Sequence, residues 1–161
     1  MCREERSRKK KKEGAVLMPC VEESLWIRGT VGDVYALASR MEDYPLFMRD
    51  VRAVRIVERG DGFTLTDWET DVDGRSFRWR ERDEFYPDEG RIVYRQVSGD
   101  VKRFEGEWRF QATEGGCHVT LTVDFDLGIP MLGPLLHPLL MKKVRENSRS
   151  MLLAIKEKIE G

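Results

Sequence analysis

Two acidic residues stand out because they fall on the aromatic side of a predicted strand. The stretch GRSFRWRERDEFY, residues 74–86, alternates with a period of two, which is typical of a strand with one buried and one solvent-facing side. Glu81 and Asp83 share a side with aromatic residues, whereas arginines occupy the other side. A carboxylate is costly to bury unless it is paired or hydrogen-bonded. Either this side opens onto water, or the two acids have partners or a ligand.

These acids suggest two kinds of chemistry. Neighbouring carboxyl groups on a partly apolar face raise each other's pKa, so they could act as general base or general acid. They could also accept hydrogen bonds from phenolic or amine groups of a ligand. His137 is a third candidate, because an ordinary histidine pKa suits proton transfer near pH 7. We therefore predict Glu81, Asp83 and His137 as catalytic residues. The alternative for Glu81 and Asp83 is that they lie in water or pair with an arginine. The alternative for His137 is that it lies in a loop and has no catalytic role.

Composition and charge exclude several classes of function. The chain has 161 residues, enough for one domain, and its formal net charge is −1. This balance gives no overall field that would attract nucleic acid. The sequence has no phosphate-binding loop, dinucleotide-binding fingerprint or CxxC pair, and only two histidines, so we expect no metal and no other cofactor. No apolar run reaches the roughly 18 residues of a membrane span, and the three widely spaced cysteines form no disulfide framework, which favours a cytoplasmic protein.

The chain divides into a tail and one domain. Residues 1–17 are a charged segment that cannot bury itself, and residues 18–161 form the predicted domain. Lysines in the tail could contact phosphates or a receptor, which is the one feature that favours an interaction module. Periodicity and turn residues predict strands at 16–28, 51–59, 62–72, 75–87, 90–98, 103–113 and 117–127, short helices at 31–41 and 42–50, and a long helix that becomes regular near Pro138.

This order predicts an α+β fold in which a curved, seven-stranded antiparallel sheet surrounds a long C-terminal helix. Such a sheet cannot pack flat against one helix along its length, so we expect an internal cavity. The aromatic residues on the inner face of the sheet could line this cavity, or they could simply form the hydrophobic core. The apolar segment 129–141 is a predicted lid that could also make transient membrane contact, or simply cap the core. The predicted ligand-contacting residues are Phe47, Trp68, Phe77, Trp79, Tyr94, Phe104, Trp108, Phe110, Leu136 and Met141.

Several local features resemble one known family. The layout over residues 18–160 is similar to the START-like, helix-grip superfamily, which includes the birch-pollen allergen fold, and within it to the polyketide cyclase/dehydrase family with its aromatase/cyclases. The matching pieces are Glu42-Asp43-Tyr44-Pro45 with Phe47, Asp61-Gly62-Phe63, Gly74-Arg75 with Phe77 and Trp79, Glu107-Trp108-Arg109-Phe110, Asp124-Phe125-Asp126, and Met151 to Ile159.

The resemblance implies a protein that binds a hydrophobic, often aromatic or polyketide-like molecule between sheet and helix. Family cyclases place an arginine on the inward face of the strand that corresponds to residues 75–87, and that position here is Asp83. The family's tyrosine corresponds to Val51, and its helix histidine falls near Met141 or Lys142. Ligand binding is therefore the leading prediction. The alternatives are an active aromatase/cyclase, a lipid or quinone carrier, and a protein or ribosome interaction module; the oligomeric state stays open.

Overall fold

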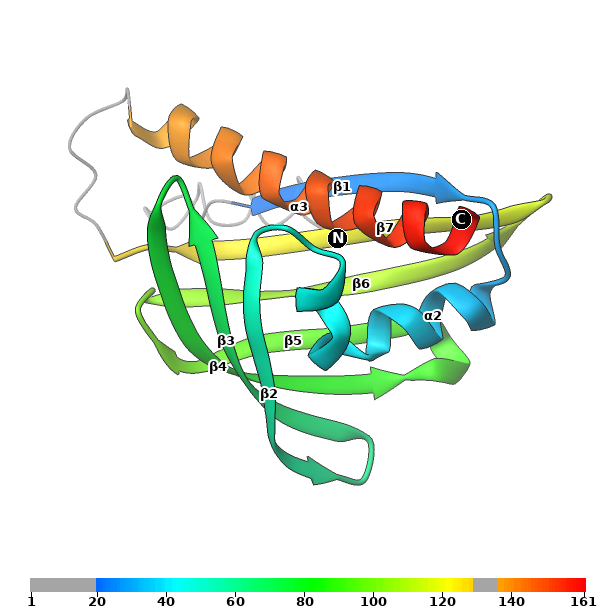
Figure 1. Cartoon of the computed structure of the whole chain (residues 1–161), viewed down its shortest axis with the longest axis horizontal. Helices are drawn as coiled ribbons and strands as arrows, with labels where there is room; N and C mark the ends of the chain where they lie inside the picture. Colours follow the sequence, from blue (N-terminus) through cyan, green and yellow to red (C-terminus); the bar gives the residue numbers. More distant parts are fainter. Residues whose placement is uncertain (1–19, 129–135) are drawn as a thin grey trace, which may run out of the picture.

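A single antiparallel sheet of seven strands curves around one long helix. The computed structural model describes residues 20–128 and 136–161. The strands lie in the order β1-β7-β6-β5-β4-β3-β2, and α3 runs across the concave face, with α2 near its C-terminal end (Figure 1). The elements are β1 (Cys20–Ile27), α2 (Val31–Ser39), the 3-10 helix η1 (Met41–Leu46), β2 (Val51–Gly60), β3 (Phe63–Val72), β4 (Arg75–Tyr86), the 3-10 helix η2 (Pro87–Glu89), β5 (Arg91–Gly99), β6 (Arg103–Thr113), β7 (Gly116–Asp126) and α3 (Leu136–Glu160).

The predicted fold class is confirmed, and the local signals behind it are visible. Thr30 caps α2, because its Oγ1 accepts a hydrogen bond from the Asp33 backbone N–H at 3.1 Å. The β3–β4 turn places Asp73 and Gly74 at positive φ, 51° and 78°, a conformation that aspartate and glycine tolerate best. Trp68 faces inward, as its alternation predicted, and Asp67 and Glu69 face the outer side.

One helix prediction needs correction. The second short helix does not extend over residues 42–50: it is a 3-10 helix that ends at Leu46. The long helix is described from Leu136, within two residues of the predicted start near Pro138. Pro138 therefore lies in the first helical turn, where the backbone N–H groups have no partner within the helix and a proline costs little.

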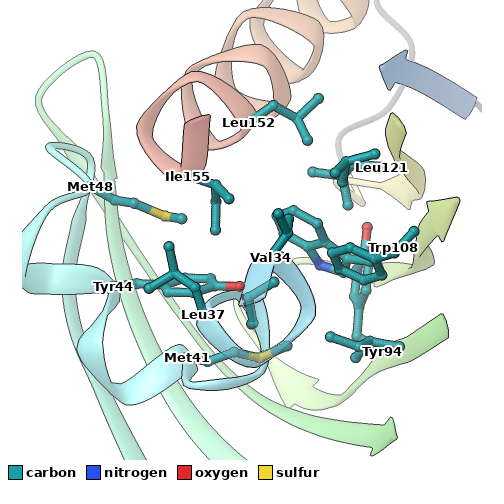
Figure 2. Packing of buried hydrophobic residues seen from close by; sticks show 14 of the residues in the cluster. Val34, Leu37, Met41, Tyr44, Met48, Tyr94, Trp108, Leu121, Leu152 and Ile155 are labelled. Carbon is teal, nitrogen blue, oxygen red and sulfur yellow. Dashed lines mark hydrogen bonds between the residues drawn. The ribbon is translucent and has the colours of Figure 1, made fainter. Parts of the chain in front are cut away.

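The core fills one end of the space between sheet and helix. Leu152 and Ile155, in the C-terminal half of α3, are fully buried and face residues of α2, η1 and the sheet, including Leu37, Tyr44 and Trp108 (Figure 2). The Tyr44 hydroxyl, also fully buried, donates to the Ala38 carbonyl and ties η1 to α2. The other end of the concave face, under the N-terminal half of α3, is left for the site described next. Over residues 20–128 and 136–161, no helix is both long and apolar enough to cross a membrane.

Candidate functional site

A cavity of about 490 Å³ lies between the sheet and the N-terminal half of α3. Its walls come from the inner faces of β3 to β7, from η1, and from α3 between Leu139 and Met151. Most of this lining is apolar and a few polar groups converge on it, which is typical of sites for hydrophobic small molecules. Six of the residues predicted to contact a ligand line it: Trp68, Phe77, Trp79, Tyr94, Phe104 and Trp108.

Aromatic rings from four strands form a continuous wall of the cavity. Trp68 and Trp79 are cross-strand neighbours in β3 and β4, and their rings stack at 5.5 Å with an interplanar angle of 9°. Phe104 of β6 packs against Trp79 at 5.4 Å and against Tyr94 of β5 at 5.9 Å. Such mutual packing holds each ring in one orientation. The wall therefore offers a preformed surface for a flat, apolar ligand.

β4 brings two carboxyl groups into this apolar interior. Glu81 lines the cavity and is 3% exposed, and Asp83, two residues further along the same face, is 0% exposed. Trp79 Nε1 donates a hydrogen bond to Glu81 Oε2 at 2.8 Å. The Thr66 hydroxyl donates to Asp83 Oδ2 at 2.8 Å, and the Thr64 hydroxyl donates to the same oxygen at 3.4 Å. Both acids are therefore held in place by neighbours on β3 and β4.

The two buried carboxyl groups lie close enough to each other to affect each other's pKa. Burial, followed by the charge of Asp83, raises the pKa of Glu81 well above its ordinary value of 4.5. Burial also raises the pKa of Asp83, although hydrogen bonds from Glu81 and the two threonines oppose this rise. Glu81 therefore gives up its proton at a higher pH than an ordinary glutamic acid. Asp83 Oδ1 is a buried oxygen that has no hydrogen-bond partner among the described residues.

The two arginines that neighbour this pair in β4, Arg80 and Arg82, point away from it. Arg80 forms an ion pair with Asp67 on the outer face at 2.8 Å. Arg82 pairs with Glu84 at 3.1 Å and lies over the ring of Phe63 at 3.9 Å. The β4–β5 register shifts between Arg80 and Glu81, but the inward and outward alternation of β4 continues through this point. Both acids are buried, and among the described residues neither forms an ion pair with an arginine, which disfavours the two alternatives of exposure to water and pairing with an arginine.

Comparison with protein families agrees with this architecture. The family model described as "Polyketide cyclase / dehydrase and lipid transport" matches residues 27–152, most of the chain. The chain belongs to this family. The resemblance predicted from the sequence is confirmed. In this family member, the position that the resemblance assigned to an inward arginine is the buried Asp83.

Three known proteins illustrate the relationship. A crystal structure of a Thermus thermophilus protein matches with a TM-score of 0.83 and 30% identity, over 88% of this chain and 97% of that one. The Zhui aromatase/cyclase from Streptomyces sp. R1128 matches with a TM-score of 0.79 and 25% identity, over 89% and 94% of the two chains. The actinorhodin polyketide synthase bifunctional cyclase/dehydratase of Streptomyces coelicolor is 32% identical over 94 residues, which are 57% of this chain. The chain spans only 30% of that relative's length.

Some predicted ligand contacts lie elsewhere in this polyketide cyclase/dehydrase fold. Phe47 packs edge-on against Tyr44 at 5.9 Å, and Phe110 packs against Tyr35 of α2 at 5.1 Å, so both belong to the filled end of the molecule. Met141 packs against the core as a partly buried residue and is not among the residues that line the cavity. These three positions do not support direct ligand contact, because an inward-facing side chain can meet either the core or the cavity.

Other predicted residues fall outside the part of the chain that the structure describes. Residues 129–135, most of the predicted lid and membrane-contact segment, lie outside the described residues, as does the tail 1–17. The side chains of Leu136 and His137 are also not described. Their proposed roles in ligand contact and proton transfer stay predictions.

Several lining residues were not predicted to contact a ligand, although Tyr44 and Val51 were named in the family resemblance. The apolar stripe of α3 and the alternation of β7 carried the signal for most of them, but neither pattern distinguishes a cavity wall from a packed core. These residues are Met41, Tyr44, Val51, Thr70, Leu121, Val123, Val144, Ser148 and Met151.

Proposed function

We propose that this protein binds a hydrophobic, ring-containing, polyketide-like molecule in the cavity between sheet and helix. The observation that carries the proposal is the cavity of about 490 Å³ whose wall includes the stacked Trp68 and Trp79. Family membership supports it, and so do relatives whose names are aromatase/cyclase and cyclase/dehydratase. Binding in the cytoplasm, transient membrane contact through residues 129–141 and the absence of a cofactor remain predictions of the sequence.

Filling the cavity should abolish binding. Val144 is a partly buried residue of α3 that lines the cavity, so Val144→Trp would place an indole where a ligand ring is expected. We expect at least a tenfold loss of affinity for 2-naphthol, measured by isothermal titration calorimetry, because the excluded ring loses most of its apolar burial. The thermal midpoint should change little, because the new ring occupies space that is empty of protein.

Leu153→Trp is the matched control, since Leu153 lies on the exposed side of the same helix at 39% exposure. It should bind 2-naphthol like the unmodified protein. Native mass spectrometry of the freshly purified protein, with analysis of its organic extract, would identify the class of any co-purified ligand. Unchanged binding by Val144→Trp, or the lack of saturable binding by the unmodified protein, would contradict the proposal.

The buried acid pair favours one second candidate, an aromatase/cyclase-like activity. Glu81 lines the cavity, and burial together with the neighbouring Asp83 raises its pKa, so the pair could move protons during ring closure of a bound chain. If this is so, the double variant Glu81→Gln with Asp83→Asn should lose turnover of a poly-β-ketone substrate by at least about a hundredfold and retain affinity within a few fold. Equal product formation by both proteins, followed by liquid chromatography, would leave ligand binding as the function.

A further inference from the structure

The Glu81 carboxyl group, at the buried end of the cavity, can accept hydrogen bonds and has no cation beside it among the described residues. Five acidic or basic side chains line the cavity among the described residues, and of these only Glu81 is buried. The other four are more exposed and lie nearer the ends of the strands and of α3: Asp73, Arg75, Asp100 and Lys143. The ion pair between Lys143 and Asp73, at 2.8 Å, satisfies that lysine at the edge of the cavity. Among the described lining residues, no basic side chain forms an ion pair with the two buried acids.

The donors next to Glu81 are already used within the protein. Trp79 Nε1 donates to Glu81 itself, and Trp68 Nε1 donates to the Thr66 hydroxyl at 2.9 Å. The Tyr94 hydroxyl donates to the Thr122 carbonyl at 2.6 Å, and Tyr44 donates to Ala38. These four groups are consequently not offered to a ligand.

Glu81 keeps capacity to accept. A carboxyl oxygen has two lone pairs, and among the described side chains the donor to Oε2 is Trp79. The buried Asp83 Oδ1 has no hydrogen-bond partner among the described residues, so a proton on Glu81 has an acceptor within the protein and need not face a ligand. A ligand carbonyl near Glu81 would thus meet oxygen lone pairs and be repelled, whereas a ligand O–H group would meet an acceptor. The adjacent indole of Trp79 would lie along the ring that carries this O–H group.

We propose that Glu81, held by Trp79 and Asp83, selects ligands that present a phenolic or enolic O–H group to the deep end of the cavity. The inference rests on the proposed function, because it assumes that a ring-containing molecule occupies the cavity. It narrows the ligand class: hydroxylated aromatic rings are preferred over quinones and over ring ethers of the same size.

Three probes of similar shape test this preference: 2-naphthol, 2-methoxynaphthalene and 1,4-naphthoquinone. Their affinities for the full chain are measured by isothermal titration calorimetry at pH 7. We expect 2-naphthol to bind at least about tenfold more tightly than either of the others, because only its O–H group can donate a hydrogen bond to the buried Glu81 oxygen, and an unpaired buried polar group is costly.

Two substitutions localise the effect. Glu81→Met has a similar shape and removes the acceptor, so the ratio between 2-naphthol and 2-methoxynaphthalene should fall to about twofold or less. Glu81→Gln retains an acceptor oxygen and an N–H group that can face Asp83, so most of the preference should remain. Circular dichroism verifies that each variant is folded, and Glu81→Gln is informative even if Glu81→Met does not fold.

The outcomes separate the two levels of the proposal. If all three probes bind the unmodified protein equally well, or if Glu81→Met keeps the full preference, the selectivity inference is overturned and the ligand-binding function stands. If none of the three probes binds, the proposed function fails, and the inference fails with it. A tenfold preference that disappears in Glu81→Met and survives in Glu81→Gln supports the inference.

Discussion

Gly106→Ala should destabilise the protein by about 2–5 kcal/mol, although the change adds only one carbon. Gly106 lies in β6 between Tyr94 of β5 and β7, and the Tyr94 hydroxyl passes it to reach the Thr122 carbonyl. A Cβ at residue 106 would lie 2.0 Å from the Thr122 carbonyl oxygen and 2.7 Å from the Tyr94 hydroxyl oxygen. The strand must move, and the buried hydroxyl would lose its acceptor.

Thermal and urea unfolding of the purified variant measure this effect, with an expected fall in the thermal midpoint on the order of 10 °C. Gly32→Ala is the control. A Cβ at residue 32 would meet only the Thr30 hydroxyl at 3.9 Å, and alanine favours the helix α2 by up to about 1 kcal/mol. A Gly106→Ala protein as stable as Gly32→Ala would show that β6 and β7 separate easily, and the described packing around Tyr94 would be wrong.

The stability of the unmodified protein should fall as the pH rises above about 4.5, through the Glu81–Asp83 pair. The folded-state pKa of Glu81 is raised well above its ordinary 4.5, first by burial and then by the charge of Asp83. Between the ordinary pKa and the folded-state pKa, the folded protein therefore binds more protons than the unfolded chain. The free energy of unfolding then decreases by up to about 1.4 kcal/mol per pH unit for each such proton. The contribution is complete below the ordinary pKa and is lost as the pH passes the folded-state pKa.

Urea unfolding across this pH range measures the slope, and the double variant Glu81→Gln with Asp83→Asn should remove most of it. The variant should also be more stable than the unmodified protein at the alkaline end, because it buries no charge. Asp61→Asn, in the exposed β2–β3 turn, is the control and should keep the slope. Asp67 acts in the opposite sense, since a hydrogen bond from Arg80 lowers its pKa, and its contribution is lost as the pH falls below about 3.8. Parallel pH profiles for the unmodified protein and the double variant would be evidence against a raised carboxyl pKa in the fold.

Much of the site was predictable from alternation in single strands. A period of two fixes which side chains share a face, so the inward positions of Trp79, Glu81 and Asp83 followed from residues 74–86 alone. The inward position of Trp68 followed from its own strand in the same way. What alternation does not give is the position of a residue along the long axis of the sheet relative to the helices. Phe110 and Phe104 share one face of β6, yet Phe104 meets the cavity and Phe110 meets Tyr35 of α2.

The sequence by itself determined the order of elements, the two faces of each strand and the family. Periodicity, turn residues and motif order are local properties of the chain and need no knowledge of distant contacts. Only the tertiary structure decided that α2 and η1 fill one end of the concave face and leave the other end hollow. It also decided that Glu81 and Asp83 are both buried, that threonines of β3 donate hydrogen bonds to Asp83, and that the neighbouring arginines turn outward. These outcomes depend on how strands and helices from distant parts of the chain pack together, and burial and hydrogen bonding across that packing set the chemistry of the two acids.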